Sequence, residues 1–185
     1  MNAHSTNYCS HCGAPVEFRI PQGDSLPRHV CPVCATIHYQ NPKLVVGSIV
    51  EWQNKILLCR RAIEPRYGFW TLPAGFMENG ESTTEAAVRE TSEEACARIE
   101  IDELFALVNL PSISQVHLFY RGKLLDTDFA AGVESLETVL FSEAEIPWEE
   151  IAFGSVSLCL KAYFADHRAG RFVFHEDVLP PNSAY

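Results

Sequence analysis

Residues 75–97 read GFMENGESTTEAAVRETSEEACA, and this pattern predicts a glycine-containing loop that runs into a helix. Ser82 and Glu85 have the spacing of a capping box, in which each side chain accepts a hydrogen bond from the backbone N–H of the other residue. We therefore expect a helix to begin at this serine. A strand expected at 69–74 completes a strand–loop–helix unit, around which the rest of the chain is organised.

Three carboxylates gather on one side of the predicted helix. At about 100° per residue, Glu90, Glu93 and Glu94 fall on one face, and Arg89 is placed to form an ion pair with Glu93. Such a cluster is ordinarily a solvated acidic surface. The glycine loop in front of it favours instead a bound cation, and oxygen ligands suit Mg²⁺ or Mn²⁺. The opposite face should pack against a core and carries Thr84, Val88, Thr91 and Ala95.

The spacing Gly75-x5-Glu81-x7-Arg89-Glu90-x2-Glu93-Glu94 resembles the Nudix box. This box is the signature of hydrolases that cleave nucleoside diphosphates linked to another moiety. The resemblance implies an α/β fold of the Nudix type, an α/β/α sandwich with a mixed sheet. It also implies a catalytic Mg²⁺ or Mn²⁺ held by Glu90, Glu94, Glu93 and the carbonyl of Gly75. Arg89 would orient Glu93.

One residue departs from the family pattern. Cys96 stands where the family usually has glycine, which closes the helix in a left-handed conformation. A residue with a side chain pays ~1 kcal/mol for that conformation. The substitution puts the end of the helix in doubt, but it changes no metal ligand.

A second motif lies near the N-terminus. Cys9, Cys12, Cys31 and Cys34 have the spacing Cys-x2-Cys-x18-Cys-x2-Cys, which is typical of a structural Zn²⁺ site. Four thiolates complete a tetrahedron and leave no position for a reacting water. Two disulfides are the alternative, but the first 30 residues lack a signal-peptide core. We expect a zinc ribbon at 1–40 and a Nudix hydrolase domain at 41–185.

Composition limits the partners and the compartment. The net charge of −10 argues against nucleic acid, whose phosphates require a basic surface. No apolar run is long enough to span a membrane. Three further cysteines (Cys59, Cys96 and Cys159) beside a metal motif fit a reducing, cytoplasmic location. The sequence leaves the oligomeric state open, with a homodimer as one option.

Periodicity predicts the remaining elements. Apolar runs and alternation indicate strands, and a second helix beginning near Phe153 should end before Gly170. The tail 171–185 has room for one strand. The expected strands are 16–20, 44–51, 56–61, 69–74, 98–108, 115–124 and 137–141.

Segments outside the box indicate the substrate. A zinc ribbon joined to this box resembles two groups, the NADH pyrophosphatases and the FAD/ADP-ribose pyrophosphatases. Residues 38–43 (HYQNPK), 70–75 (WTLPAG) and 132–137 (GVESLE) look like the second group, and the Pro- and Gln-rich signature of the first is not found. The resemblance therefore implies a small-molecule dinucleotide or nucleotide-sugar substrate, with ADP-ribose or FAD cleaved to AMP and a second monophosphate.

Two other functions stay open from the sequence. One is NADH or NAD-cap pyrophosphatase activity. The other is a zinc-ribbon interaction module with an inactive Nudix scaffold, which the intact box carboxylates oppose.

The general base should come from outside the helix, because carboxylates that bind a cation are poor bases. The loop 125–136 is irregular and could close on a substrate. We rank Glu137 first, since it lies at the start of a strand, and Glu134 second, with Glu93 as the rival on the helix. Of Arg60, Arg61 and Arg66, we expect two to be ordinary surface residues and one to contact phosphate.

Overall fold

The computed structural model describes residues 6–181, which form two compact units that divide after Asn41. The first unit contains a three-stranded antiparallel sheet of order β1-β2-β3. Its strands are β1 (Glu17–Arg19), β2 (Arg28–Val30) and β3 (Ile37–His38).

The four motif cysteines of the first unit converge as a metal site requires. Their sulfur atoms all lie within 4.8 Å of one another, with Cys9 Sγ 3.6 Å from Cys34 Sγ and Cys12 Sγ 3.5 Å from Cys31 Sγ. A tetrahedral Zn²⁺ with Zn–S bonds of about 2.3 Å places sulfurs about 3.8 Å apart. These separations are too long for disulfides, whose S–S bond is about 2.05 Å.

The two Cys-x2-Cys turns have similar backbone geometry. Gly13 and Ala35, the residues after each pair, both have positive φ, which wraps the backbone around the sulfurs. A backbone N–H from each turn reaches a cysteine Sγ, from His11 to Cys9 at 3.4 Å and from Cys34 to Cys31 at 3.5 Å. The donor set and its supporting hydrogen bonds fit Zn²⁺.

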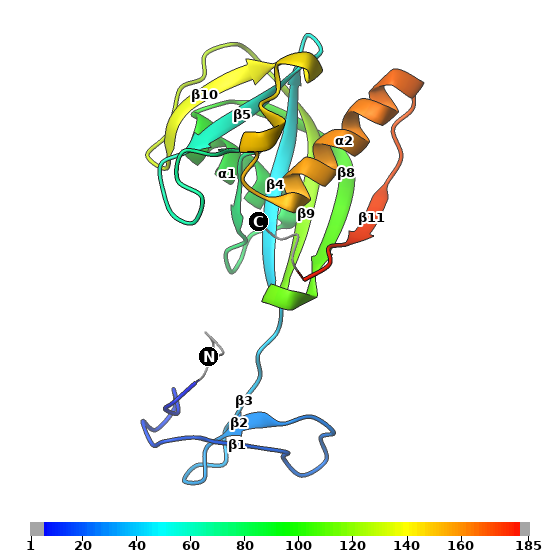
Figure 1. Ribbon diagram of the computed structural model, residues 1–185. Helices are drawn as coiled ribbons and strands as arrows, with labels where there is room; N and C mark the ends of the chain where they lie inside the picture. Colours follow the sequence, from blue (N-terminus) through cyan, green and yellow to red (C-terminus); the bar gives the residue numbers. More distant parts are fainter. Residues whose placement is uncertain (1–5, 182–185) are drawn as a thin grey trace. The chain divides into compact units, whose positions relative to one another are not determined.

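The second unit is built on a mixed sheet of order β10-β5-β4-β9-β8-β11 (Figure 1). β6 pairs with β5, and β7 pairs with β4. The pairs β4–β9 and β8–β11 are parallel, and the others are antiparallel. The strands are β4 (Lys43–Trp52), β5 (Lys55–Arg61), β6 (Trp70–Thr71), β7 (Ala74–Phe76), β8 (Ile99–Leu110), β9 (Gln115–Leu124), β10 (Ser135–Phe141) and β11 (His175–Val178). The helices are α1 (Thr83–Ala95) and α2 (Gly154–Ala169), and the short 3₁₀ turns are η1 (Pro111–Ile113), η2 (Glu143–Glu145) and η3 (Trp148–Glu150).

The two helices cover opposite faces of this sheet (Figure 1). Side chains of β4 point to the two faces: Ile49 belongs to the core beneath α2, and Val46 belongs to the core beneath α1. Strands buried on both faces read as continuous apolar runs. The expected α/β/α sandwich with a mixed sheet is confirmed. Among the described residues, no helix is both long and apolar enough to span a membrane.

The strand expected at 69–74 is divided. β6 pairs with β5, whereas β7 pairs with β4, and Leu72 and Pro73 lie between them. Proline has no N–H for a strand ladder. Its carbonyl instead accepts a hydrogen bond from the backbone N–H of Ser48 at 3.1 Å, so the chain crosses from one strand to the other here.

Helix α1 begins with the predicted capping box. Ser82 and Glu85 exchange both hydrogen bonds, and Cys96 closes the helix with φ of 48°, in the left-handed conformation that glycine usually supplies. The helix therefore ends in the usual left-handed conformation although Cys96 has a side chain.

The expected inner face of α1 was partly wrong. Thr91 and Ala95 are buried, but Thr84 and Val88 are exposed. The helix instead rests on a neighbouring face that includes Ala86 and Ala87, small residues that let it approach the sheet. This rotation also buries Glu90 and Glu94, which are 8% and 6% exposed.

The cysteine site generates a direct prediction. The purified protein should contain about one Zn²⁺ per chain, since four thiolates form one closed tetrahedral site. Cys31→Ser should lose the metal and lower the thermal stability of the first unit, because metal binding there contributes folding free energy.

The matched control is Cys96→Ser, which changes an exposed thiol outside the site. It should keep its zinc in the same elemental analysis. Well-folded wild-type protein without zinc would refute the assignment.

Candidate active site

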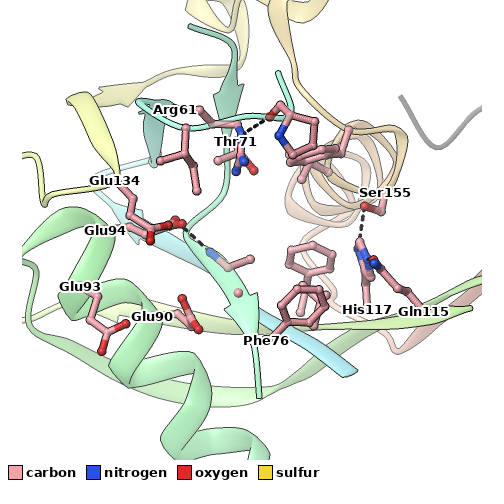
Figure 2. A pocket seen from close by; sticks show the side chains of 18 of the residues that line it. Arg61, Thr71, Phe76, Glu90, Glu93, Glu94, Gln115, His117, Glu134 and Ser155 are labelled. Carbon is pink, nitrogen blue, oxygen red and sulfur yellow. Dashed lines mark hydrogen bonds between the residues drawn. The ribbon is translucent and has the colours of Figure 1, made fainter. Parts of the chain in front are cut away.

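A cavity of about 830 Å³ opens in the second unit and has two chemically different ends. Figure 2 shows Glu90, Glu93, Glu94 and Glu134 on one side and Gln115, His117 and Ser155 on the other. We refer to them as the acidic end and the apolar end, since the latter also includes Leu110, Ile113, Phe119, Phe153 and Val156.

Glu94 is the most deeply buried acid of the acidic end. Its Oε2 accepts a hydrogen bond from the backbone N–H of Ala74 at 3.1 Å, which joins α1 to β7. Burial, with the charge of Glu90 nearby, raises the pKa of Glu94 to about 8. A bound cation would stabilise the ionised form that burial disfavours.

Glu90 lies against the backbone of Gly75. A Cβ at position 75 would lie 2.4 Å from both carboxylate oxygens of Glu90, so only glycine fits there. Burial raises the pKa of Glu90, opposed by a hydrogen bond of 2.8 Å from Arg89 Nη1 to Oε1. The glycine of the motif therefore brings backbone and carboxylate together.

Arg89 holds the loop and the helix in one arrangement. Its Nε and Nη2 donate to the two carboxylate oxygens of Glu81 at 3.0 and 2.7 Å, and its Nη1 also reaches Glu93 at 3.1 Å. This pairing lowers the pKa of Glu81 to about 2. Glu81 in turn accepts the backbone N–H of Glu78 at 2.6 Å. The expected contact between Arg89 and Glu93 exists, but the bidentate contact is with Glu81.

Glu134 is brought to the acidic end by the C-terminus of α1. The backbone N–H groups of Ala130 and Gly132 donate to the carbonyls of Ala95 and Glu94, both at 3.0 Å. These carbonyls are among the groups that a helix end leaves unpaired. A Cβ at Gly132 would lie 1.7 Å from the carbonyl oxygen of Glu93, so this close approach requires glycine. The segment we expected to be a closing loop is docked on the helix.

Glu137 lies elsewhere. It is opposite Arg60 in the β10–β5 ladder and forms an ion pair with it at 3.1 Å, with both side chains about half exposed. It is not among the residues that line the cavity, whereas Glu134 is. The structure thus brings our second choice, not our first, to the box carboxylates.

One of the three arginines enters the cavity. Arg61 is 9% exposed, donates from Nε to the carbonyl of Pro65 at 2.9 Å and stacks on the ring of Phe153 at 5.0 Å. Neither Arg60 nor Arg66 lines the cavity. Strand alternation could have indicated this difference, because neighbouring residues of a strand point to opposite faces.

The apolar end contains polar residues that no motif indicated. Gln115 and His117 lie on β9 at alternate positions with Phe119, and Ser155 lies in the first turn of α2. His117 Nε2 is 2.9 Å from Gln115 Oε1, and its Nδ1 is 3.0 Å from Ser155 Oγ. Burial lowers the pKa of His117 to about 4. Polar residues at the inward positions of an apolar strand were the available signal.

The acidic end fits a divalent cation by the chemistry of its donors. It offers carboxylate oxygens from α1 and backbone from the Gly75 loop, which are the ligands of hard cations. Within the described chain, the cysteines are the one group of acid, histidine or cysteine side chains whose ligand atoms all lie within 4.8 Å. Hydrogen bonds from Arg89 and from the backbone N–H of Ala74 hold the glutamates in place.

Family models match both units of the chain. The model described as "Nudix N-terminal" matches residues 7–40, and the model described as "NUDIX domain" matches residues 41–155, more than half of the chain. The chain belongs to the Nudix hydrolase family. The resemblance on which the sequence expectations relied is confirmed.

Relatives of this Nudix protein carry different names. The ADP-ribose pyrophosphatase of Methanocaldococcus jannaschii is 33% identical over 113 residues, covering 59% of this chain and 67% of the relative. The NAD-capped RNA hydrolase NudC of Chromobacterium violaceum is 32% identical over 99 residues, covering 52% of this chain and 35% of the relative. The chain thus spans only about a third of the length of that NudC.

A solved structure resembles almost the whole chain. The crystal structure of a NUDIX hydrolase from Nitrosomonas europaea has a TM-score of 0.92 and 56% identity, covering 94% of this chain and 99% of that one. The similarity thus extends over both units of this chain.

Proposed function

We propose that this protein hydrolyses the diphosphate linkage of ADP-ribose and FAD-type nucleotides, giving AMP and a second monophosphate. The observation that carries the proposal is that one cavity has both an acidic end and an apolar end. A nucleoside diphosphate derivative has the same two parts, an anionic diphosphate and an aromatic base. The archaeal relative named as an ADP-ribose pyrophosphatase supports the same substrate.

Mg²⁺ or Mn²⁺ would be held by Glu90, Glu94 and Glu93 with the carbonyl of Gly75. When bound, the cation neutralises charge that develops on the phosphoryl oxygens during attack by water. This arrangement also explains how a chain with a net charge of −10 accepts an anionic substrate. Arg61, at the wall of the cavity, is the cation of the chain best placed to contact a phosphate.

Glu134 takes the proton from the attacking water in this scheme. The water oxygen forms a bond to one phosphorus, and the bond from that phosphorus to the bridging oxygen breaks. Among the described residues, no hydrogen bond or ion pair occupies the Glu134 carboxylate, so its lone pairs are free to accept a proton. Glu93 and Glu137 are instead paired with Arg89 and Arg60.

A second candidate is hydrolysis of NADH or of NAD-capped RNA. The observation that favours it is the relation to NudC and to the human mitochondrial NAD(P)H pyrophosphatase NUDT13, which is 26% identical over 181 residues. The acidic charge of the chain favours a small-molecule substrate over RNA. None of the seven cysteines, all of which lie in the described part of the chain, forms a disulfide, which supports a reducing compartment such as the cytoplasm.

A substrate panel tests the proposal. With Mg²⁺ and with Mn²⁺, ADP-ribose and FAD should be hydrolysed with a higher kcat/KM than NADH, an NAD-capped RNA oligonucleotide or 8-oxo-dGTP. Chromatography of the products should show AMP and one further monophosphate. A panel that ranks NADH first would replace the proposed substrate with the second candidate.

A matched pair of substitutions tests Glu134 as the general base. Glu134→Gln should lower kcat at least ~10²-fold, the lower scale for loss of a general base. Glu137→Gln makes the same chemical change in an exposed ion pair, where such pairs contribute little, and should leave kcat near that of the wild type.

Glu93→Gln, with Mn²⁺ affinity measured separately, is the third variant. If Glu93→Gln lowers kcat without weakening Mn²⁺ binding, while Glu134→Gln has the kcat of the wild type, the general base lies on the helix. The role assigned to Glu134 would then be wrong.

A further inference from the structure

The apolar end of the cavity contains one directional hydrogen-bond chain. The Oε1 atom of Gln115 carries no hydrogen, so His117 Nε2–H must be the donor over the 2.9 Å between them. A neutral imidazole then has its Nδ1 available as an acceptor, and the hydroxyl of Ser155 donates to it at 3.0 Å. Burial lowers the pKa of His117 to about 4, so the ring is neutral at pH 7.

These two hydrogen bonds determine which part of Gln115 is available to a ligand. Ser155 is fully buried and His117 is 8% exposed, so both are fixed inside the protein, whereas Gln115 is partly exposed and lines the cavity. His117 occupies the amide oxygen. Among the described residues, the amide nitrogen of Gln115 has no hydrogen-bond partner. The cavity therefore presents a neutral N–H donor, and the buried His117 and Ser155 fix its orientation.

The surroundings of this donor favour a flat, uncharged ring. The walls at this end come from Leu110, Ile113, Phe119, Phe153 and Val156. Aromatic rings stack on one another in offset or edge-to-face arrangements. Beside Gln115 a phosphate would face a neutral histidine, and the cation at these walls, Arg61 on the ring of Phe153, is the one that the proposed function assigns to the diphosphate. A ribose would leave its hydroxyls against apolar walls, at a cost in free energy.

We propose that Gln115, oriented by His117 and Ser155, is a specificity-determining residue that donates a hydrogen bond to a ring nitrogen of the adenine base at the apolar end. This inference rests on the proposed function, because adenine is the only aromatic ring of ADP-ribose. It also assigns the AMP half of the substrate to this end. FAD and NADH contain the same AMP half, so the residue acts on all three and does not distinguish among them.

Calorimetric binding of the two products of ADP-ribose hydrolysis, AMP and ribose 5-phosphate, in the presence of Mg²⁺ tests the inference without turnover. The wild type should bind AMP more tightly than ribose 5-phosphate. Gln115→Met keeps the length of the side chain and removes the amide, and it should weaken AMP binding about tenfold, the scale of one hydrogen bond. Binding of ribose 5-phosphate should not change.

Two further variants separate recognition from distortion. Gln53→Leu removes an amide in the exposed β4–β5 turn, outside the cavity, and should leave both affinities unchanged. Ser155→Ala removes the far end of the chain and should weaken AMP binding by a smaller factor, because Gln115 loses orientation but not its donor. In kinetics with ADP-ribose, Gln115→Met should raise KM and leave kcat nearly unchanged.

Each remaining outcome contradicts the inference. Equal wild-type affinity for AMP and ribose 5-phosphate, unchanged AMP affinity in Gln115→Met, or equal loss of both ligands would each overturn it. The proposed function fails separately. If AMP binding depends on Gln115 but ADP-ribose is not hydrolysed, the adenine site is supported and the proposed substrate is wrong.

Discussion

Two buried carboxylates of α1 impose the main physical constraint on this protein. Glu90 and Glu94 lie on the sheet side of the helix, where desolvation opposes their ionised forms. The surroundings compensate with specific groups: the N–H of Ala74 reaches Glu94, and Arg89 reaches Glu90. Buried charges are tolerated when they are paired or bind metal. Gly75 lies so close to Glu90 that a Cβ there would collide with the carboxylate.

The end of the same helix completes the site. Its last carbonyls lack partners within the helix, and they accept hydrogen bonds from the 130–132 segment. This docking places Glu134 beside the box carboxylates. Helix α1 therefore carries Glu90 and Glu94 itself and positions Glu134 through its C-terminal carbonyls. Gly75 and Gly132 serve the same purpose, since each allows backbone to lie where a Cβ would collide with α1.

Local signals in the sequence predicted much of this arrangement. The capping box located the start of α1, Cys-x2-Cys spacing located the cysteine cluster that fits Zn²⁺, and apolar runs located the central strands. The rotation of α1 escaped prediction, because Val88 and Thr84 looked suitable for a core while the actual contact depends on how closely Ala86 and Ala87 approach the sheet. The position of Glu137 outside the cavity escaped prediction for a similar reason, because its pairing with Arg60 depends on which strands lie side by side. The apolar end had no motif at all, only Gln115 and His117 at inward positions of a strand.

The most direct test of this account is the Mn²⁺ affinity and kcat of Glu94→Gln. The substitution keeps the shape of the side chain and removes the charge that the buried site holds for a cation. We predict weaker Mn²⁺ binding by electron paramagnetic resonance and a loss in kcat of at least ~10²-fold, the scale of removing one key electrostatic element. Glu100→Gln, at an exposed position of β8, should change neither quantity. A Glu94→Gln protein that binds Mn²⁺ and turns over like the wild type would show that the buried acids do not form the catalytic metal site.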